Sequence, residues 1–179
     1  MHPNFQRILI MAFKELALRQ SGMQIMFTTH SPAVVKELSL KDVRLVKVNE
    51  RNEREVLAID NGILLYPSLN EINYLAYGEA CEEYHNELYG YPETRGWINC
   101  YTEAEGREVR DYYRETNKKL KLEKCDLSTY IRHQIHHPEN EKNKRYTPEE
   151  LRQSISDMRK YIKIRHNEEN EKKSKEIFE

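Results

Sequence analysis

Long apolar runs and paired cysteines are both missing from this chain. No stretch of its 179 residues approaches the roughly 20 consecutive apolar residues of a membrane-spanning helix. The first residues do not combine a basic region, an apolar stretch and a cleavage site, so no secretory signal is expected. The cysteines, Cys81, Cys100 and Cys125, are odd in number and form no Cys-x-x-Cys pair, which argues against a disulfide framework. We therefore expect a cytoplasmic protein with no membrane partner.

The chain also has no excess of charge of either sign. Its 29 Lys and Arg residues are balanced by 30 Asp and Glu residues, which gives a net charge of -1. This balance excludes a general electrostatic footprint for nucleic acid, so any RNA binding has to be local. Hydrophobic residues make up 38% of the chain, which predicts a modest core. Its 12 tyrosines suit helix interfaces that are apolar on one side and hydrated on the other.

The most distinctive stretch runs from Thr129 to Asn140 and reads TYIRHQIHHPEN. It contains one arginine and three histidines and then a proline: Arg132, His133, His136, His137 and Pro138. Arginine is a planar cation that can bind a phosphate through two N–H groups. Histidine can take and return a proton near neutral pH. These side chains together suit metal-independent RNA cleavage, with histidine as general acid or base and arginine stabilising the phosphorane.

A helix is predicted to carry this cluster and to start near Asp126. Arg132 and His136 are four residues apart and would share one helix face. The residue before a proline is displaced from the α region, so His137 is expected at the helix exit, where it can swing back toward Arg132. The same pattern is also typical of a polar helix end whose histidines are structural.

The run resembles the R-x4-6-H motif of the HEPN superfamily, in which an arginine and a polar residue precede a histidine. Arg132, His133 and His137 match that motif. The resemblance implies an all-α bundle that dimerises and brings two motifs face to face. Many members of the family are metal-independent RNases, whereas others only bind or assemble. The resemblance also makes His85 and Glu87, in an earlier NELY-containing run, second candidates for the site.

From Ser68 onward the apolar spacing is helical. A short amphipathic segment stops at Gly78, and the next helix, Glu79 to Tyr89, is expected to be broken by Gly90 and Pro92. Cys81 and His85 could form half of a metal site, but no second pair matches them, so no metal is predicted.

The rest of this region is more varied. Thr102 to Lys119 is charged and is expected to be a helix or a partly ordered insertion. Thr147-Pro148-Glu149-Glu150 is a capping box that predicts the start of the last helix. Residues after Arg165 are nearly all charged and are expected to fray or stay disordered.

The N-terminal part has an alternating pattern of helix and strand. A helix is predicted from Pro3 to Ser21-Gly22, and a buried parallel strand is predicted from Gln24 to Thr29. Ser31 can cap a helix whose first residue is Pro32. His30 would then lie at the carboxyl edge of a sheet, where open α/β sheets bind ligands. Two further strands, 43–48 and 55–59, are predicted to form a hairpin.

The segment HPNFQRILIMAFKELALRQSGMQIMFTTHSPAVV resembles the end of an ABC/SMC-like ATPase domain. That resemblance makes His30 the switch histidine that contacts the γ-phosphate of ATP, and Gln6 falls at the family's glutamine position. The sequence has no G-x-x-x-x-G-K-[ST] motif, no LSGG-type signature and no Walker B acid. We therefore expect the C-terminal piece of a longer ATPase that does not hydrolyse ATP alone. ATP and Mg²⁺ would bind only to the complete ATPase.

These observations predict an α+β fold: the C-terminal fragment of an α/β P-loop ATPase domain over 1–66, an all-α HEPN-like bundle over 67–165 and a charged tail over 166–179. This layout resembles anticodon-nuclease-type phage-defence proteins and, in outline, Septu- and retron-associated ATPases. The leading hypothesis is a metal-independent RNase, cutting RNA or tRNA under ATPase control and needing no cofactor for cleavage. Arg132 would bind phosphate, His137 would act as base or acid, and His133 would orient the site.

Two other interpretations stay open at this point. The helical region could be a non-catalytic platform that dimerises the ATPase or docks a partner nuclease, which the many tyrosines and the balanced charge also suit. The missing nucleotide-binding motifs are also typical of a degenerate remnant. The expected partners are RNA, a second copy of the chain, and a separate chain that supplies the N-terminal ATPase half or a nuclease.

Overall fold

The computed structural model describes residues 3–31, 34–35, 37–59, 62–65, 68–104, 106–116 and 119–176. The chain divides into two compact units, residues 1–79 and 80–179. Both helices and strands are present, so the fold class is α+β as the sequence predicts. The expected domain boundary lay at residue 66, whereas the first unit continues through the next helix. No helix in the described residues is long and apolar enough to cross a membrane.

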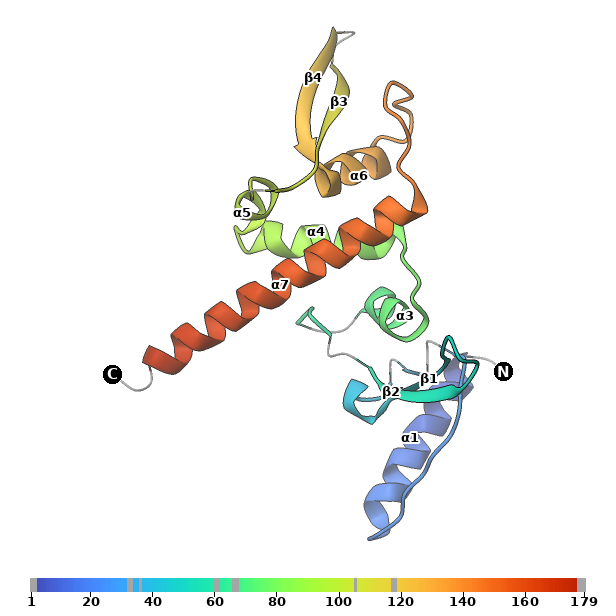
Figure 1. Ribbon diagram of the computed structural model, residues 1–179. Coiled ribbons are helices and arrows are strands. Elements are labelled where there is room, and N and C mark those ends of the chain that lie inside the picture. The colour runs from blue at the N-terminus through green and yellow to red at the C-terminus, as the bar shows by residue number, and fades with distance from the viewer. Residues whose placement is uncertain are drawn as a thin grey trace. The chain divides into compact units, whose positions relative to one another are not determined.

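In its described residues the first unit has two longer helices, one short helix and a hairpin (Figure 1). Its elements are α1 (Pro3–Arg19), the 3-10 helix η1 (Leu40–Asp42), β1 (Arg44–Val48), β2 (Arg54–Ala58) and α3 (Leu69–Tyr77). The strands β1 and β2 pair antiparallel, with Val46 opposite Val56. The start and end of α1 and the hairpin therefore agree with the sequence pattern. Ser68 caps α3, and Gly78 ends it with a φ of 72° that suits glycine.

The parallel strand expected from Gln24 to Thr29 is wrong. These residues form no strand, and Met26 is 85% exposed. A strand needs a neighbour for its backbone N–H and C=O groups, and in the described residues β1 and β2 pair only with each other. The apolar pattern of this segment is therefore not matched by a sheet that could bury it. The helix expected to begin at Pro32 falls on residues 32–33 and 36, which lie outside the described residues.

The second unit is a set of packed helices with one hairpin. Its elements are α4 (Glu82–Thr94), α5 (Ile98–Thr102), β3 (Val109–Thr116), β4 (Lys119–Asp126), α6 (Leu127–His136) and α7 (Pro148–Glu176). Helices α4, α6 and α7 pack on one another. These helices and α5 carry large side chains with no exposed surface: Tyr84, Leu88, Tyr101, Ile131, Ile155, Met158 and Ile162. This core holds α6, the helix of the arginine-histidine cluster, in place.

The expectation of an all-α region is wrong, because β3 and β4 form an antiparallel hairpin. Tyr113 lies opposite Leu122, and the ladder runs from Val109–Asp126 to Thr116–Lys119. The hairpin extends away from the helices of its own unit (Figure 1). Leu120 and Leu122 alternate with lysines on β4, which is the period of a strand, whereas β3 has no such alternation. The high charge of the segment and the irregular pattern of β3 conceal the hairpin in the sequence.

Two further expectations about helices are also wrong. Helix α4 runs through Gly90 and Pro92 to Thr94. A proline inside a helix costs about 3 kcal/mol, but Pro92 lies in the last turn and is buried together with Tyr89, so packing offsets that cost.

The charged residues 166–176 continue α7 as a helix, where a disordered tail was expected. The capping box at its start is confirmed, since Thr147 and Glu150 bond each other's backbone N–H groups at 3.2 and 2.7 Å.

Candidate functional site

Helix α6 is fixed at both ends. Asp126 caps its N-terminus, and its carboxylate accepts hydrogen bonds from the Ser128 N–H at 3.0 Å and the Thr129 hydroxyl at 2.5 Å. At the other end the His137 N–H donates to the His133 carbonyl at 2.9 Å, and His137 has left the helical region with φ -128° and ψ 61°. The exit before Pro138 therefore confirms the predicted end of the helix. The cluster occupies the last turn and a half of α6.

Arg132 points toward α4. Its Nη2 atom lies 3.2 Å from Oε2 of Glu93, and its guanidinium carbon lies 4.5 Å from the centre of the Tyr89 ring. The Tyr89 hydroxyl is in turn 3.0 Å from Oγ1 of Thr129 on α6. About a quarter of the Arg132 side chain is exposed. The guanidinium is thus held on one side by an aromatic face and a carboxylate and is open to solvent on the other.

His133 points toward the β3–β4 hairpin instead. Its ring centre lies 4.7 Å from that of Tyr112, and its Nε2 atom lies 3.2 Å from Nη2 of Arg114. A guanidinium can only donate, so Nε2 accepts, and the proton of the neutral ring is on Nδ1. Burial, followed by the positive charge of Arg114, lowers the pKa of His133. The ring is therefore neutral near pH 7 and has its accepting nitrogen in use.

His136 and His137 are the exposed histidines of the cluster. His136 shares the face of Arg132, as four-residue spacing requires. Nδ1 of His137 donates to Oε1 of Glu139 at 3.3 Å. A carboxylate accepts only, so the neutral His137 ring keeps its proton on Nδ1 and presents the lone pair of Nε2. Of the three rings in the cluster, these two are open to a substrate.

The earlier candidates His85 and Glu87 lie on α4. His85 has no exposed surface, and its Nε2 atom lies 3.0 Å from the hydroxyl of Ser154. From there hydroxyl contacts continue from Ser154 to Ser128 at 2.7 Å and from Ser128 to Tyr101 at 2.8 Å. Burial, followed by the charge of Arg132, lowers the pKa of His85 to about 3. His85 is therefore a neutral interior group beneath the cluster, whereas Glu87 is partly exposed.

His30 lies in the first unit and is exposed in an irregular segment. Next to it, the Ser31 hydroxyl donates to Oε1 of Gln6 on α1 at 2.8 Å, and the Ser31 N–H donates to Oγ1 of Thr29 at 3.0 Å. The bond to Gln6 connects the segment to α1, and the bond to Thr29 lies within the segment itself.

The loop after α6 is held by side-chain amides. The buried Gln134 donates to the Lys144 carbonyl at 2.7 Å and accepts from the Tyr146 N–H at 3.1 Å. Asn143 bonds both the N–H and the C=O of Tyr113, at 2.7 and 3.0 Å, and so pairs with the outer edge of β3. The loop that begins beside His137 is therefore tied to both α6 and the hairpin.

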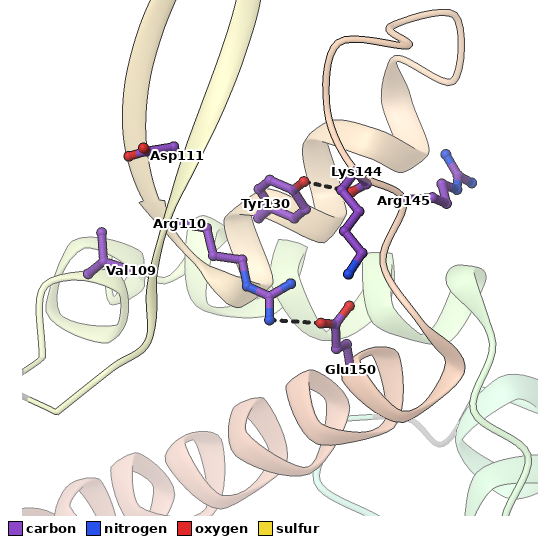
Figure 2. A pocket seen from close by; sticks show the side chains of 7 residues that line it. All are labelled: Val109, Arg110, Asp111, Tyr130, Lys144, Arg145 and Glu150. Carbon is purple, nitrogen blue, oxygen red and sulfur yellow. Dashed lines mark hydrogen bonds and ion pairs between the residues drawn. The ribbon is translucent and has the colours of Figure 1, made fainter.

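An open pocket of about 430 Å³ lies between β3, this loop and the start of α7. Figure 2 shows its lining residues: Val109, Arg110, Asp111, Tyr130, Lys144, Arg145 and Glu150. Arg110 is already paired with Glu150 at 2.8 Å and with Glu108 at 2.6 Å. The Arg145 side chain points away from Glu150 (Figure 2) and pairs with Glu82 at 3.2 Å. The pocket cations are thus largely neutralised, and none of the predicted site residues lines it.

Sequence reasoning missed the groups that surround the cluster. Glu93 and Tyr89 come from α4, and Tyr112 and Arg114 come from β3. Tyr112 and Arg114 are two residues apart, which is the spacing that places two side chains on the same face of a strand. This spacing was the signal available in the sequence. Within the described residues, no group of three or more His, Cys, Asp and Glu side chains could hold a metal ion. Comparison with known proteins found no matching family model, no matching curated protein and no matching solved structure.

Proposed function

We propose that the second unit is a metal-independent endoribonuclease whose site is the end of α6. The observation that carries this proposal is the juxtaposition, on one helix end, of a partly exposed guanidinium and two exposed imidazoles: Arg132, His136 and His137. A phosphodiester needs a cation to stabilise the charge of its phosphorane and two proton-transfer groups for cleavage, and these side chains supply them.

The reaction is an internal transfer of the phosphoryl group. An imidazole removes the proton from a ribose 2′-OH, whose oxygen attacks the adjacent phosphorus. The bond from phosphorus to the 5′ oxygen then breaks, and a protonated imidazole donates a proton to that leaving oxygen. The products are a 2′,3′-cyclic phosphate and a 5′-hydroxyl end.

The surroundings give each side chain a role in this reaction. His137 is the base, since Glu139 holds its Nδ1 proton and leaves Nε2 with a free lone pair. His136, which shares the face of Arg132, is the acid. Arg132 binds the phosphate, and Tyr89 and Glu93 hold its guanidinium in position. His133 orients the cluster, because its accepting nitrogen is occupied by Arg114.

Incubation of the purified chain with total tRNA and single-stranded RNA in EDTA tests this proposal. Wild-type protein is expected to produce fragments with cyclic phosphate ends, and the His137→Ala and Arg132→Ala variants are expected to produce them at least about 10²-fold more slowly. Equal cleavage by all three proteins would show that the end of α6 is not the site of RNA cleavage. The Lys160→Ala variant, at an exposed position of α7, is the control and is expected to cut like the wild type.

The first unit is, in this proposal, the C-terminal part of an ATPase that controls cutting. The Ser31–Gln6 hydrogen bond beside His30 supports that assignment, as does the exposed apolar side of α1, which includes Phe5, Ile8 and Met11. ATP and Mg²⁺ would act through the complete ATPase only.

A non-catalytic assembly role is favoured by a different observation. Arg132 and His133 both have close partners in the fold, Glu93 and Arg114, so these side chains also serve as ties between elements. Absence of cutting by the wild type, together with dimers that dissociate when Arg132 is replaced, would favour this second function.

A further inference from the structure

The register of the β3–β4 hairpin separates its charges onto two faces. Cross-strand partners share a face, and successive residues alternate between faces. One face, here called the basic face, carries four cations and one carboxylate: Arg110, Arg114, Lys119, Lys121 and Glu123, together with Tyr112. The other face has the opposite balance, with Asp111, Glu115 and Asp126 against Lys124. A chain with a net charge of -1 thus has a locally positive surface.

The basic face continues directly into the candidate site. Arg114 bonds His133 at 3.2 Å, and Tyr112 packs on the same ring at 4.7 Å between centres. Arg110 lies 5.5 Å from the centre of the Tyr130 ring, one turn earlier on α6. All three contacts are made to the helix that carries Arg132, His136 and His137. A ligand bound along this face would therefore reach the end of α6.

The cations of the outer part of the hairpin are accessible to a ligand. Lys121 is 72% exposed and Arg114 is 46% exposed. Glu123 lies between them, 3.2 Å from Nε of Arg114 and 3.0 Å from Nζ of Lys121, and directs both toward one surface. Exposed ion pairs of this kind contribute little to stability, so a phosphate can replace the carboxylate at small cost.

We propose that the basic face is an arm that binds the phosphate backbone of an RNA strand leading to the end of α6. Arg114 lies opposite Lys121, and Lys119 follows about 6.8 Å further along β4, so three cations are grouped on the outer part of this face. This positive group matches a polyanion, and the contact of Arg114 with His133 places the RNA strand beside Arg132. The inference depends on the proposed function for the position of the cut. RNA binding itself can be measured without any cutting.

The test measures binding of a fluorescent single-stranded RNA by anisotropy, in a His137→Ala background so that the RNA stays intact. Lys119→Glu with Lys121→Glu reverses two charges on the basic face. The control, Lys124→Glu with Lys160→Glu, makes the same change in total charge on the opposite face and on exposed α7. Both double variants must unfold at the wild-type temperature before their binding is compared.

The basic-face variant is expected to bind at least about tenfold more weakly. The slope of log K against log salt should become shallower by about 1.4, since each lost phosphate contact accounts for about 0.7. The control should change affinity by less than about twofold. Equal weakening in both variants, or unchanged binding by the basic-face variant, would contradict the proposal that the basic face binds RNA. If RNA binding depends on the hairpin but the wild-type protein never cuts RNA, the binding proposal stands and the nuclease proposal is wrong.

Discussion

The guanidinium of Arg114 donates a hydrogen bond to Nε2 of His133 over 3.2 Å, and it thereby joins a strand to the motif helix. The bond determines which ring nitrogen carries the proton and keeps His133 from acting as a free base. It also separates the roles of neighbouring histidines, because His137 has no such cationic partner among the described residues and pairs with Glu139. One residue of an unexpected hairpin therefore sets the chemistry of a residue that the sequence did single out.

The pKa of His133 should move in opposite directions in two variants of the hairpin. Arg114 lowers this pKa and Glu123 raises it, in addition to the larger lowering by burial. Arg114→Gln is therefore expected to raise the pKa toward the ordinary value, whereas Glu123→Gln is expected to lower it further. Titration of the His133 ring by NMR measures both. A shift of the same sign in both variants would show that the ring responds to solvent exposure rather than to these charges.

Two replacements of Arg132 should show how much of its effect on RNA cleavage comes from its positive charge and how much from its planar pair of N–H donors. Arg132→Ala removes the donor to the phosphorane and is expected to reduce the cleavage rate by about 10²-fold or more. Arg132→Lys keeps the charge but not the planar pair of donors, so an intermediate loss of about tenfold is expected. Single-turnover rates with a defined RNA give these values. The bond to Glu93 is partly exposed, so neither variant should unfold the protein.

The result for Arg132 is informative only if both variants are folded. Trp97 is the single tryptophan, is buried in the second unit, and provides the fluorescence check. If Arg132→Ala cut RNA as fast as the wild type, the site would have to be elsewhere in the chain.

The buried His85 should make the second unit less stable in mild acid. Its folded pKa of about 3 lies below the unfolded value of about 6.5, so the unfolded chain binds more protons once the pH falls below 6.5. Stability is then fully present above 6.5 and is lost as the pH falls. Between pH 7 and pH 5 the expected loss is about 2 kcal/mol, measured by urea unfolding with Trp97 fluorescence.

The His85→Gln variant isolates this effect. It is expected to lower stability at pH 7 but to lose much less between pH 7 and pH 5 than the wild type. Some dependence on pH should persist, because burial also lowers the pKa values of His133 and His166. The exposed His136→Gln is the control and should keep the wild-type difference. An unchanged difference in His85→Gln would mean that another group titrates on unfolding.

Local signals in this sequence were strong wherever a short-range rule determined the structure. The capping box at Thr147 and Glu150, the glycine stop at Gly78 and the helix exit before Pro138 all involve neighbours in the chain, and all are present. Pro92 shows the limit of such rules, because its burial in the core outweighs the local penalty. The strand predicted over 24–29 failed for a related reason, since pairing depends on another strand.

The candidate site was foreseen in its parts but not in its surroundings. The chain order alone brings Arg132, His133, His136 and His137 to one helix end. Glu93 is 39 residues from Arg132 and Arg114 is 19 residues from His133, and only the folded core brings these pairs together. Arg132 and His133 point in different directions because adjacent helix positions are about 100° apart, but the sequence does not show which charged partner each side chain contacts.

Gln134 is expected to be the main support of the loop that follows the site. The residue is 3% exposed, and its side-chain amide bonds the Lys144 carbonyl and the Tyr146 N–H. The backbone carbonyl of Gln134 accepts from the Arg145 guanidinium at 3.1 Å. Gln134→Leu keeps the size of the side chain but leaves the Tyr146 N–H without its partner. The expected loss is about 1–3 kcal/mol in urea unfolding followed by Trp97 fluorescence.

Gln153→Leu is the matched control for Gln134→Leu, because Gln153 is exposed on α7 and its amide donates to the carboxylate of Asp157. It should change stability by less than about 0.5 kcal/mol. Amide exchange separates a local effect from a global one: in Gln134→Leu the Tyr146 and Tyr113 N–H groups should exchange faster than those of the α7 core. This is expected because loosening of the loop also releases Asn143 from the edge of β3. Equal acceleration throughout the second unit would instead make Gln134 an ordinary core residue with no special hold on the loop.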